Sequence, residues 1–247
     1  MRANVWLRCL REAPEAESRL VVFPHAGGAA SYFFPLSRAL SPKVEVFAVQ
    51  YPGRQDRRRE KTFEEVVPLA ERLVEQLRPV DDHRPVVYFG HSLGATVAFE
   101  VARRLEAEGN GPRALIASAR CAPSAHRSHE IHLLDDAGIV AELRKLSGTA
   151  DRLLDDEELL ETLMPAIRGD YKAAETYSYT PGPPLNCPVF GFYGDDDVRV
   201  GEEDLLGWKA HTVGGFELHG LPGGHFYPSE NPTRTAEEIE ARVGSVM

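Results

Sequence analysis

Short apolar runs, rich in β-branched and aromatic residues, alternate along the chain with stretches of helical period. The runs occupy residues 20–23, 44–51, 85–89, 114–119, 188–193 and 216–221. A strand that is covered on both faces has no polar side, so it forms a continuous apolar run rather than an alternating one. The pattern therefore predicts strands that are buried on both faces of a parallel sheet.

Helical spacing fills the stretches between these runs. Residues 62–78 and 93–108 repeat apolar positions every three or four residues, and the second stretch stops at Gly109. Alternating strands and helices predict right-handed crossovers and a doubly wound arrangement. We expect an α/β fold with a mostly parallel central sheet flanked by helices. No internal repeat or linker divides residues 1–247, so we expect a single domain.

One connection is unusually long. About 68 residues, 120–187, separate the fourth and fifth predicted strands, and their pattern is helical. It predicts helices over 136–146, ending at Gly148, over 155–164, ending at Pro165, and over 166–177. Long connections in compact domains are usually functional, which favours a helical lid insertion over 120–187. The alternative is an ordinary crossover helix with surface decoration.

The central chemical feature of the chain is a G-x-S-x-G motif, Gly90 to Gly94, placed between a predicted strand and a predicted helix. This order is the nucleophile elbow of the α/β-hydrolase fold, in which a tight turn exposes the serine and needs very small neighbours. We expect Ser92 to be a nucleophile, aided by the positive end of the following helix. The alternative is a serine in an ordinary strand-to-helix loop.

A serine hydroxyl needs a base, and an acid that orients the base. In this fold the chain order is serine, acid, histidine. His225 follows the last predicted strand in a glycine-rich loop, whereas His219 falls inside that strand. The loop after 188–193 carries Asp195, Asp196 and Asp197, and the residues alone leave all three open as the acid.

The oxyanion of the reaction needs two backbone N–H donors. One donor is expected at Leu93, directly after the nucleophile. The other is expected in the small-residue segment 23–28, which follows the first predicted strand. The alternative for that segment is a plain glycine turn.

Charge and composition exclude several other classes of function. The net charge is −10, which argues against nucleic acid or an anionic membrane as the main partner. The three cysteines form no CxxC or metal-type cluster, so we expect neither disulfides nor a metal site, and a reducing compartment. The apolar stretch at residues 3–7 is too short for the core of a signal peptide, so we expect none, and no run approaches the roughly 18 residues of a membrane span. We expect a free-standing cytoplasmic monomer without a cofactor.

Several motifs together resemble the type II thioesterases of polyketide and nonribosomal peptide synthesis. They are P-H-A-G-G at 24–28, P-G-R at 52–54, G-H-S-L-G at 90–94, Y-G-D-D-D at 193–197, G-G-H-F at 223–226, and, in the long connection, L-S-G at 146–148 and R-G-D-Y at 168–171. The resemblance implies Asp197 as the acid and Ala26 as the first oxyanion donor.

The resemblance also implies the substrate: an acyl group held as a thioester on the phosphopantetheine arm of an acyl or peptidyl carrier protein. Such enzymes clear wrong acyl groups or release intermediates. Three alternatives use the same sequence features. One is a carboxylesterase or lipase that acts on small esters, and another is a hydrolase fold reused as a non-catalytic binding module. The third is a chain-terminating cyclase domain, although such domains are normally fused to a synthase.

Two further groups of residues have open roles. Arg54, Arg57, Arg58 and Arg59 form a basic cluster that is either a docking patch for an acidic carrier protein or a solvated loop. Phe33 and Phe34 are candidates for lining an acyl channel, although core packing is expected for at least one. The same choice applies to the apolar positions of the long connection, Ile139, Leu143, Leu153, Leu159, Leu160 and Leu163.

Overall fold

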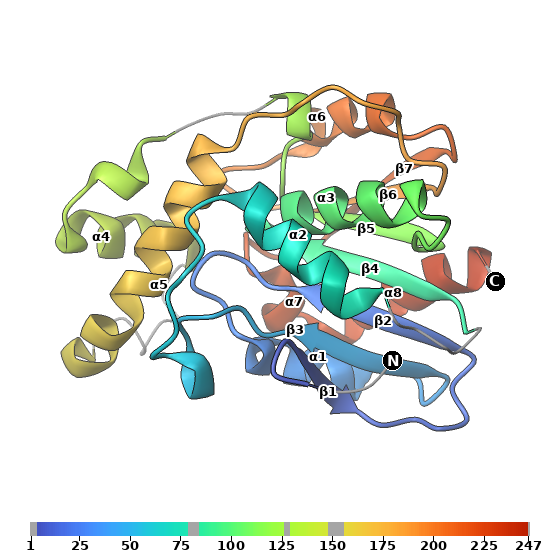
Figure 1. The fold of residues 1–247 in the computed structure, drawn as a ribbon, viewed down its shortest axis with the longest axis horizontal. Helices are drawn as coiled ribbons and strands as arrows, with labels where there is room; N and C mark the ends of the chain where they lie inside the picture. Colours follow the sequence, from blue (N-terminus) through green and yellow to red (C-terminus); the bar gives the residue numbers. More distant parts are fainter. Residues whose placement is uncertain (1–3, 79–83, 126–128, 148–155, 247) are drawn as a thin grey trace.

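The computed structural model describes residues 4–78, 84–125, 129–147 and 156–246. Within these ranges, seven strands form one sheet in the order β1-β3-β2-β4-β5-β6-β7 (Figure 1). The strands are β1 (Leu7–Arg11), β2 (Ser18–Phe23), β3 (Val44–Val49), β4 (Val86–His91), β5 (Ala114–Ser118), β6 (Val189–Gly194) and β7 (Phe216–Leu221). All neighbouring pairs are parallel except β1 with β3, which is antiparallel. The prediction of a mostly parallel α/β sheet is confirmed.

The strands β2 to β7 coincide with the six predicted runs. Every residue of β2, β3 and β5 is buried, as the continuous apolar runs indicate. The edge strand β1 was not predicted. Its sequence, Leu-Arg-Cys-Leu-Arg, mixes charged and apolar residues, and four of its five residues are only half-buried. β1 therefore lacks the apolar run that marks the other six. At the opposite edge, β7 was predicted, but most of its residues are half-buried or exposed, so the expectation of burial on both faces is wrong for residues 216–221.

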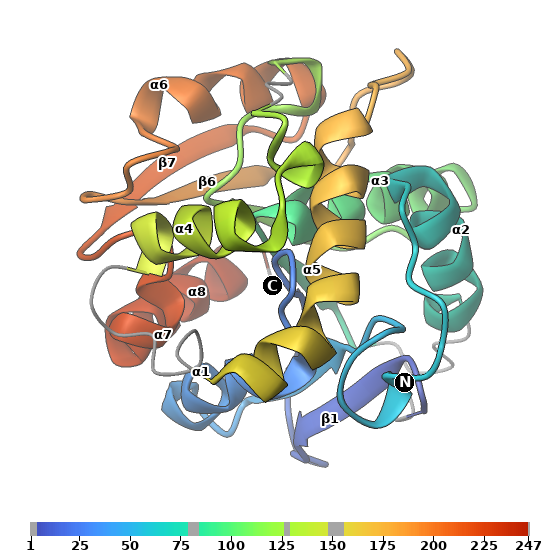
Figure 2. The ribbon, with the colours of Figure 1, turned by 90° about the vertical axis from the view of Figure 1, so that its left-hand side faces the viewer.

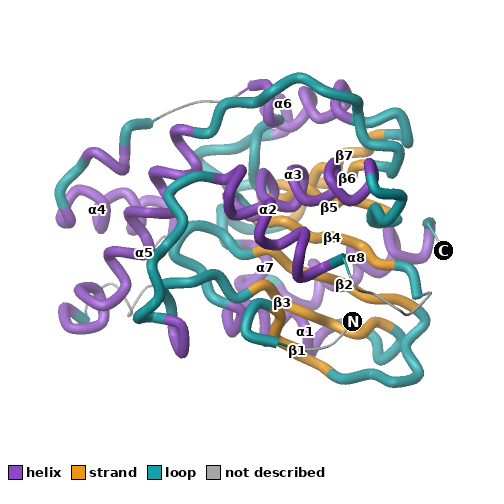
Figure 3. The backbone as a smooth tube through the Cα atoms, in the orientation of Figure 1, coloured by secondary structure: helices purple, strands orange, loops and turns teal. Residues whose placement is uncertain are grey.

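Helices cover both faces of the sheet (Figures 1 and 3). One face carries α2 (Val66–Leu77) and α3 (Leu93–Ala107), and the other carries α1 (Phe34–Ala39), α7 (Tyr227–Glu230) and α8 (Pro232–Ser245). A short helix, α6 (Glu202–Leu205), follows β6. The helix predicted over 62–78 begins only at Val66, because the backbone is still extended at Glu65. Two clusters of apolar side chains, one on each face, form the core.

Two helices of the long connection lie beyond one end of the sheet. They are α4 (Asp136–Ser147) and α5 (Glu157–Thr176), and Figure 2 looks onto them from that end. The prediction of two helices that meet at Pro165 is wrong, because α5 runs through this proline. A proline removes one backbone hydrogen bond, and the buried positions continue on both sides of it, from Met164 to Ala174. The predicted boundaries at Gly148 and residue 155 lie outside the described residues.

The helices were compared with the length and apolarity of a membrane span. Among the helices of the described ranges, none has the length and apolarity required to cross a bilayer.

Candidate active site

A pocket opens where the carboxyl ends of the parallel strands face α4 and α5. The loops after five strands reach it, with Ala26 after β2, Ser92 after β4, Arg120 after β5, Arg199 after β6 and His225 after β7. Leu143 and Leu146 of α4, and Tyr171 and Ala174 of α5, complete its wall. Its cavity volume is about 80 Å³. Small-molecule sites usually measure roughly 300–1,000 Å³, so this pocket is small for such a site.

Ser92 lies at the turn between β4 and α3. Its backbone has φ 53° and ψ −119°, a strained conformation for a residue other than glycine. The turn is fixed by two hydrogen bonds, from the Ser92 N–H to the Ser118 carbonyl at 2.8 Å and from the Ala95 N–H to the Ser92 carbonyl at 2.9 Å. This geometry places the serine in the pocket at the N-terminus of α3.

The glycines of the motif are required by contact with backbone atoms. A Cβ at Gly94 would lie 2.0 Å from the Phe23 carbonyl oxygen, and one at Gly90 would lie 2.4 Å from the Gly94 carbonyl oxygen. Neither neighbour is a flexible side-chain end that can move aside. The expectation of a tightly packed elbow therefore has a direct steric cause.

Asp197 and His225 are brought together from the loops after β6 and β7. The His225 Nδ1 lies 2.7 Å from the Asp197 Oδ2, and their side chains are 5% and 0% exposed. The other carboxylate oxygen accepts the Arg199 and Val200 N–H groups, at 2.9 and 3.3 Å. Asp195 and Asp196 are exposed. Of the three aspartates, Asp197 is therefore the one whose carboxylate is held against the imidazole.

Ser92 and His225 line the same pocket, but no hydrogen bond joins these two described residues. Catalytic hydrogen bonds are often long in unliganded enzymes and tighten when the substrate binds. The competing histidine, His219, lies within β7 and contacts Glu217, Glu238 and Arg242 instead. His225 is the histidine that shares the pocket with the serine and contacts the buried carboxylate.

The two expected oxyanion donors also face the pocket. Leu93 is the first residue of α3, and the first N–H groups of a helix have no partner within the helix. Ala26 lies across the pocket in the loop after β2, where Gly27 adopts φ 75°. The loop conformation thus depends on a left-handed glycine, as the small-residue segment indicated.

Two more histidines, His25 and His91, pack around the site. Their rings lie 5.6 Å apart, and the His91 ring lies 5.4 Å from that of His225. Burial, together with the nearby His225 and Arg54, lowers the pKa of His25 to about 3, and burial places the pKa of His91 well below its usual value. Both rings are therefore neutral and add no positive charge beside His225.

The sequence did not reveal what holds His91. Its Nδ1 lies 2.8 Å from the Ser118 hydroxyl, which in turn bonds to the Tyr227 hydroxyl. Ser118 and Tyr227 are buried and lie 109 positions apart in the chain. No local sequence motif predicts this contact, because it depends on how β5 and α7 pack against each other.

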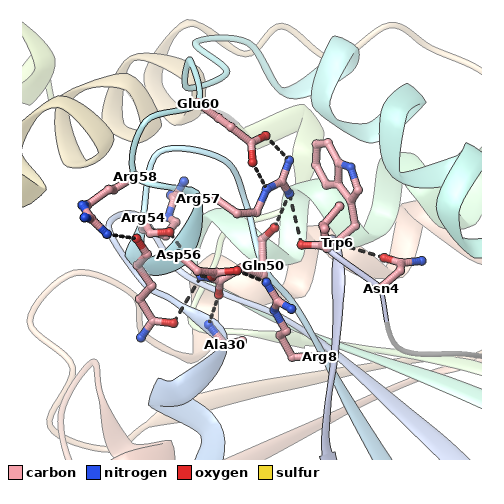
Figure 4. A network of polar contacts seen from close by, with 12 residues as sticks. Asn4, Trp6, Arg8, Ala30, Gln50, Arg54, Asp56, Arg57, Arg58 and Glu60 are labelled. Atoms are coloured by element: carbon pink, nitrogen blue, oxygen red, sulfur yellow. Dashed lines mark hydrogen bonds and ion pairs between the residues drawn. The ribbon is translucent and has the colours of Figure 1, made fainter.

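The basic cluster at 54–59 is not a uniform exposed patch. Arg54 and Arg57 are buried, whereas Arg58 and Arg59 are exposed. The Arg57 guanidinium lies over the Trp6 ring at 4.0 Å and bonds to Glu60 and to the Gln50 carbonyl (Figure 4). Both interpretations of the cluster, docking patch and solvated loop, are therefore wrong for Arg54 and Arg57, whose guanidinium groups bind partners inside the molecule.

The residues that were candidates for lining an acyl channel also differ in their positions. Phe33 is fully buried against Phe89 in the core, Phe34 is exposed, and neither lines the pocket. Leu143 does line it, and Ile139 packs behind Leu143 in the cluster between α4 and α5. Leu153 lies outside the described residues. Of these candidates, those on α4 contribute to the pocket wall, whereas the two residues after the loop of Ala26 do not.

The chain is similar to known thioesterases over most of its length. A family model of the thioesterase domain matches residues 18–243. The probable cadicidin biosynthesis thioesterase of Streptomyces griseus is 47% identical over 234 residues, which cover 95% of this chain but only 64% of that protein. Thioesterase PikA5 of Streptomyces venezuelae is 49% identical over 226 residues, covering 91% of this chain and 80% of PikA5.

A solved structure is equally similar. The type II thioesterase BorB from the borrelidin biosynthetic cluster superposes with a TM-score of 0.90, at 49% identity, over 98% of each chain. The superposition therefore includes nearly the entire length of both chains.

Proposed function

The chain belongs to the thioesterase domain family, and from that premise we propose that it hydrolyses acyl groups from the phosphopantetheine arm of acyl or peptidyl carrier proteins. It is a serine hydrolase that acts on thioesters, of the type II kind found with polyketide and nonribosomal peptide pathways. The observation that carries the proposal is the buried, hydrogen-bonded pair of Asp197 and His225, which shares one pocket with the strained serine elbow.

We assign the steps to these residues as follows. Ser92 attacks the thioester carbonyl while His225 takes the hydroxyl proton, and Asp197 stabilises the imidazolium that forms. The N–H groups of Leu93 and Ala26 hold the oxyanion. The carbon–sulfur bond then breaks, the protonated His225 gives its proton to the departing sulfur, and the pantetheine thiol leaves an acyl-Ser92 behind. Water activated by His225 then hydrolyses this ester, which restores the serine and releases the free acid.

The pathway role that fits this chemistry is editing or release. The curated relative from Streptomyces griseus is named for cadicidin biosynthesis and BorB for the borrelidin cluster. By analogy, we propose that the present chain removes acyl groups from the carrier proteins of such a pathway. The segment 120–187 is proposed to act as a lid, because α4 and α5 supply one wall of a pocket too small for a long acyl chain.

We further propose that the protein works as a monomer in the cytoplasm. Cys9, Cys121 and Cys187 are free thiols, in keeping with a reducing compartment. Size-exclusion chromatography with light scattering tests the oligomeric state, and a mass twice that of one chain contradicts it.

The direct experiment is intact-mass analysis of carrier proteins that bear different acyl groups, before and after incubation with this protein. We expect loss of the acyl mass with the phosphopantetheine arm retained. Carrier proteins that keep their acyl groups would contradict the proposal.

Two controls separate the alternatives. A marked preference for simple esters over acyl-carrier protein would favour a carboxylesterase. Failure of a fluorophosphonate probe to label Ser92 would favour a binding module without catalysis.

A further inference from the structure

The loop that carries Ala26 is held on both sides by side chains from distant parts of the chain. The Tyr51 hydroxyl donates to the Pro24 carbonyl at 3.3 Å. The Asp170 carboxylate accepts the Gly27 N–H at 2.7 Å. The Arg54 Nε donates to the Gly28 carbonyl at 3.0 Å. The peptide group just after Ala26 is thus held by Asp170, and the carbonyl groups of Pro24 and Gly28 are held on either side of it.

Two of these side chains form an ion pair with each other. The Arg54 Nη2 bonds to the same Asp170 oxygen that accepts the Gly27 N–H, and the two side chains are only 2% and 4% exposed. The Arg54 Nη1 donates to the Pro52 carbonyl at 2.5 Å, and its guanidinium lies 5.1 Å from the centre of the Tyr51 ring. Arg54 is therefore held at every nitrogen of its guanidinium.

The pair joins two sequence motifs that lie 116 positions apart, P-G-R at 52–54 and R-G-D-Y at 168–171. Asp170 belongs to α5, whose Tyr171 and Ala174 line the pocket. The helix also touches the loop directly, since a Cβ on Gly27 would lie 2.8 Å from Ile167 Cγ1. The loop conformation and the position of α5 are consequently fixed by the same contacts.

A pair of this kind is costly to maintain. Burial raises the pKa of the Asp170 carboxyl, although Arg54 and the Gly27 N–H act in the opposite direction. Well-packed apolar residues often replace a buried ion pair without loss of stability, so stability alone is weak grounds for keeping one. The contacts to Gly27 and Gly28 indicate instead that the pair holds the backbone of the loop that carries Ala26.

We propose that Arg54 and Asp170 are positioning residues, which orient the Ala26 N–H towards the developing oxyanion. Because Asp170 belongs to α5, this orientation depends on the position of that helix. This inference rests on the proposed function, because it assigns a purpose to the oxyanion loop. A misplacement of about 1 Å in such a site lowers the rate by about 100-fold. Loss of the pair should therefore lower kcat much more than it changes KM.

The test uses the double variant Arg54→Met/Asp170→Leu, which removes both charges together and leaves no unpaired buried ion. A small acyl thioester serves as the substrate, so that docking of a carrier protein plays no part. Rates are divided by the number of serines that a fluorophosphonate probe labels at completion, which counts folded sites only. We expect kcat per labelled site to fall by about 10–100-fold, with KM changed by less than about threefold.

A second measurement follows the oxyanion hole itself. A boronic acid that forms a tetrahedral adduct on the serine should lose affinity by a factor similar to the loss in kcat. A purely structural role predicts instead that kcat per labelled site is unchanged. The milder variant Asp170→Asn keeps an acceptor for the Gly27 N–H and serves if the double variant does not fold, with a smaller loss expected in the same direction.

The matched control is Lys172→Ala. Lys172 lies two residues further along α5 and ties it to Glu64 by an exposed ion pair, away from the loop. Its kcat should stay within about twofold of the parent, since exposed pairs contribute little. Equal losses in the control and in the double variant would overturn the inference. If the parent protein hydrolyses the small thioester but leaves acylated carrier proteins intact, the proposed function fails while the inference is still judged by the variants.

Discussion

At the scale of single residues, the serine elbow leaves no space for change. A methyl group at position 94 meets the Phe23 carbonyl oxygen at 2.0 Å, and this carbonyl belongs to the strand beside the oxyanion loop. The collision cannot be relieved by a side-chain rotation. We expect Gly94→Ala to lower the free energy of unfolding by about 3 kcal/mol or more.

Urea denaturation of Gly94→Ala beside Gly244→Ala checks this expectation. Gly244 lies in α8, and a Cβ added there would meet nothing within 4 Å. Alanine at this position should therefore leave stability unchanged or raise it by less than about 1 kcal/mol. Similar losses in both variants would show that the elbow contact is not the cause.

The proposed nucleophile has a simpler test. Ser92→Ala removes the hydroxyl but keeps the backbone of the turn, so the protein should fold and kcat for an acyl thioester should fall by about 10⁴-fold or more. Steady-state kinetics, with circular dichroism as the control for folding, measure this. If the variant keeps a tenth of the parent's activity, Ser92 is not the nucleophile.

His25 makes the stability of the fold sensitive to acid. Its pKa is about 3 in the folded protein against an ordinary value of 6.5, because burial disfavours the charged ring. Between these values the unfolded chain binds a proton that the folded chain does not. The free energy of unfolding should therefore fall as the pH drops through this window, by up to about 1.4 kcal/mol per pH unit for this group.

Replacing His25 with phenylalanine removes this titration and keeps an aromatic ring against Tyr32 and Phe226, its present neighbours. Urea denaturation at intervals across the window should give a shallower dependence on pH for His25→Phe than for the parent. Parallel pH profiles would show that the His25 ring is protonated in the fold.

The sequence could predict residues whose chemistry is tied to a local motif. Ser92 and His225 stand out because glycines flank them and predicted strands precede them, and the structure places both in one pocket. Asp197 could be separated from Asp195 and Asp196 only through the family resemblance. The pairing of Arg54 with Asp170 was invisible, because it depends on how α5 crosses the end of the sheet.

At the scale of elements, buried elements were predicted best, although β7 was also predicted while most of its residues are half-buried or exposed. The fully buried strands show in the sequence as unbroken apolar runs, whereas β1 at the edge and the short helices α1, α6 and α7 carry little periodicity. Pro165 misled the prediction for α5 because a local rule about proline was outweighed by packing on both sides of it.

The element that offers the clearest functional test is α4. It is tied to the loop of Asp197 by an ion pair, in which the Arg199 Nη2 lies 2.5 Å from the Glu142 Oε2, with the side chains 19% and 21% exposed. Arg199 also donates its backbone N–H to Asp197. If the segment 120–187 is a lid, this pair helps to hold the pocket at its small volume.

We expect Glu142→Gln to shift the preference towards longer acyl chains. Loosening α4 lets the wall recede, so kcat/KM should rise severalfold for a long-chain thioester relative to a short one. The ratio is measured for a series of acyl lengths. Glu237→Gln, which breaks an exposed ion pair on α8 far from the pocket wall, is the control and should leave the ratio unchanged. An unchanged ratio in Glu142→Gln would argue against the lid.

At the scale of the whole molecule, the net charge bears on how this protein would bind the proposed carrier protein. The net charge of −10 opposes the approach of another acidic protein, so docking needs a local positive surface. The four arginines of the loop at 54–59 suggested such a positive surface in the sequence. In the structure Arg54 and Arg57 are buried, which leaves Arg58 and Arg59 as its exposed cations.

These two cations share their surroundings with exposed carboxylates. Asp56 pairs with Arg8, Glu60 with Arg57, and Glu64 with Lys172, so the field around the loop is mixed in sign. Salt screens what remains beyond about 8–10 Å. We therefore expect Arg58→Glu/Arg59→Glu to change KM for an acylated carrier protein by less than about threefold, with the same small effect on a small thioester.

The measurement compares KM for both substrates at low and at physiological salt. A rise of about tenfold for the carrier-borne substrate alone, abolished by salt, would show that two exposed arginines are enough to steer the carrier. A uniform result would exclude Arg58 and Arg59 as the docking site, and the elements around the pocket, α4 foremost, are the next to test. In that case variants of α4 should alter KM for the carrier-borne substrate where variants of the arginine loop do not.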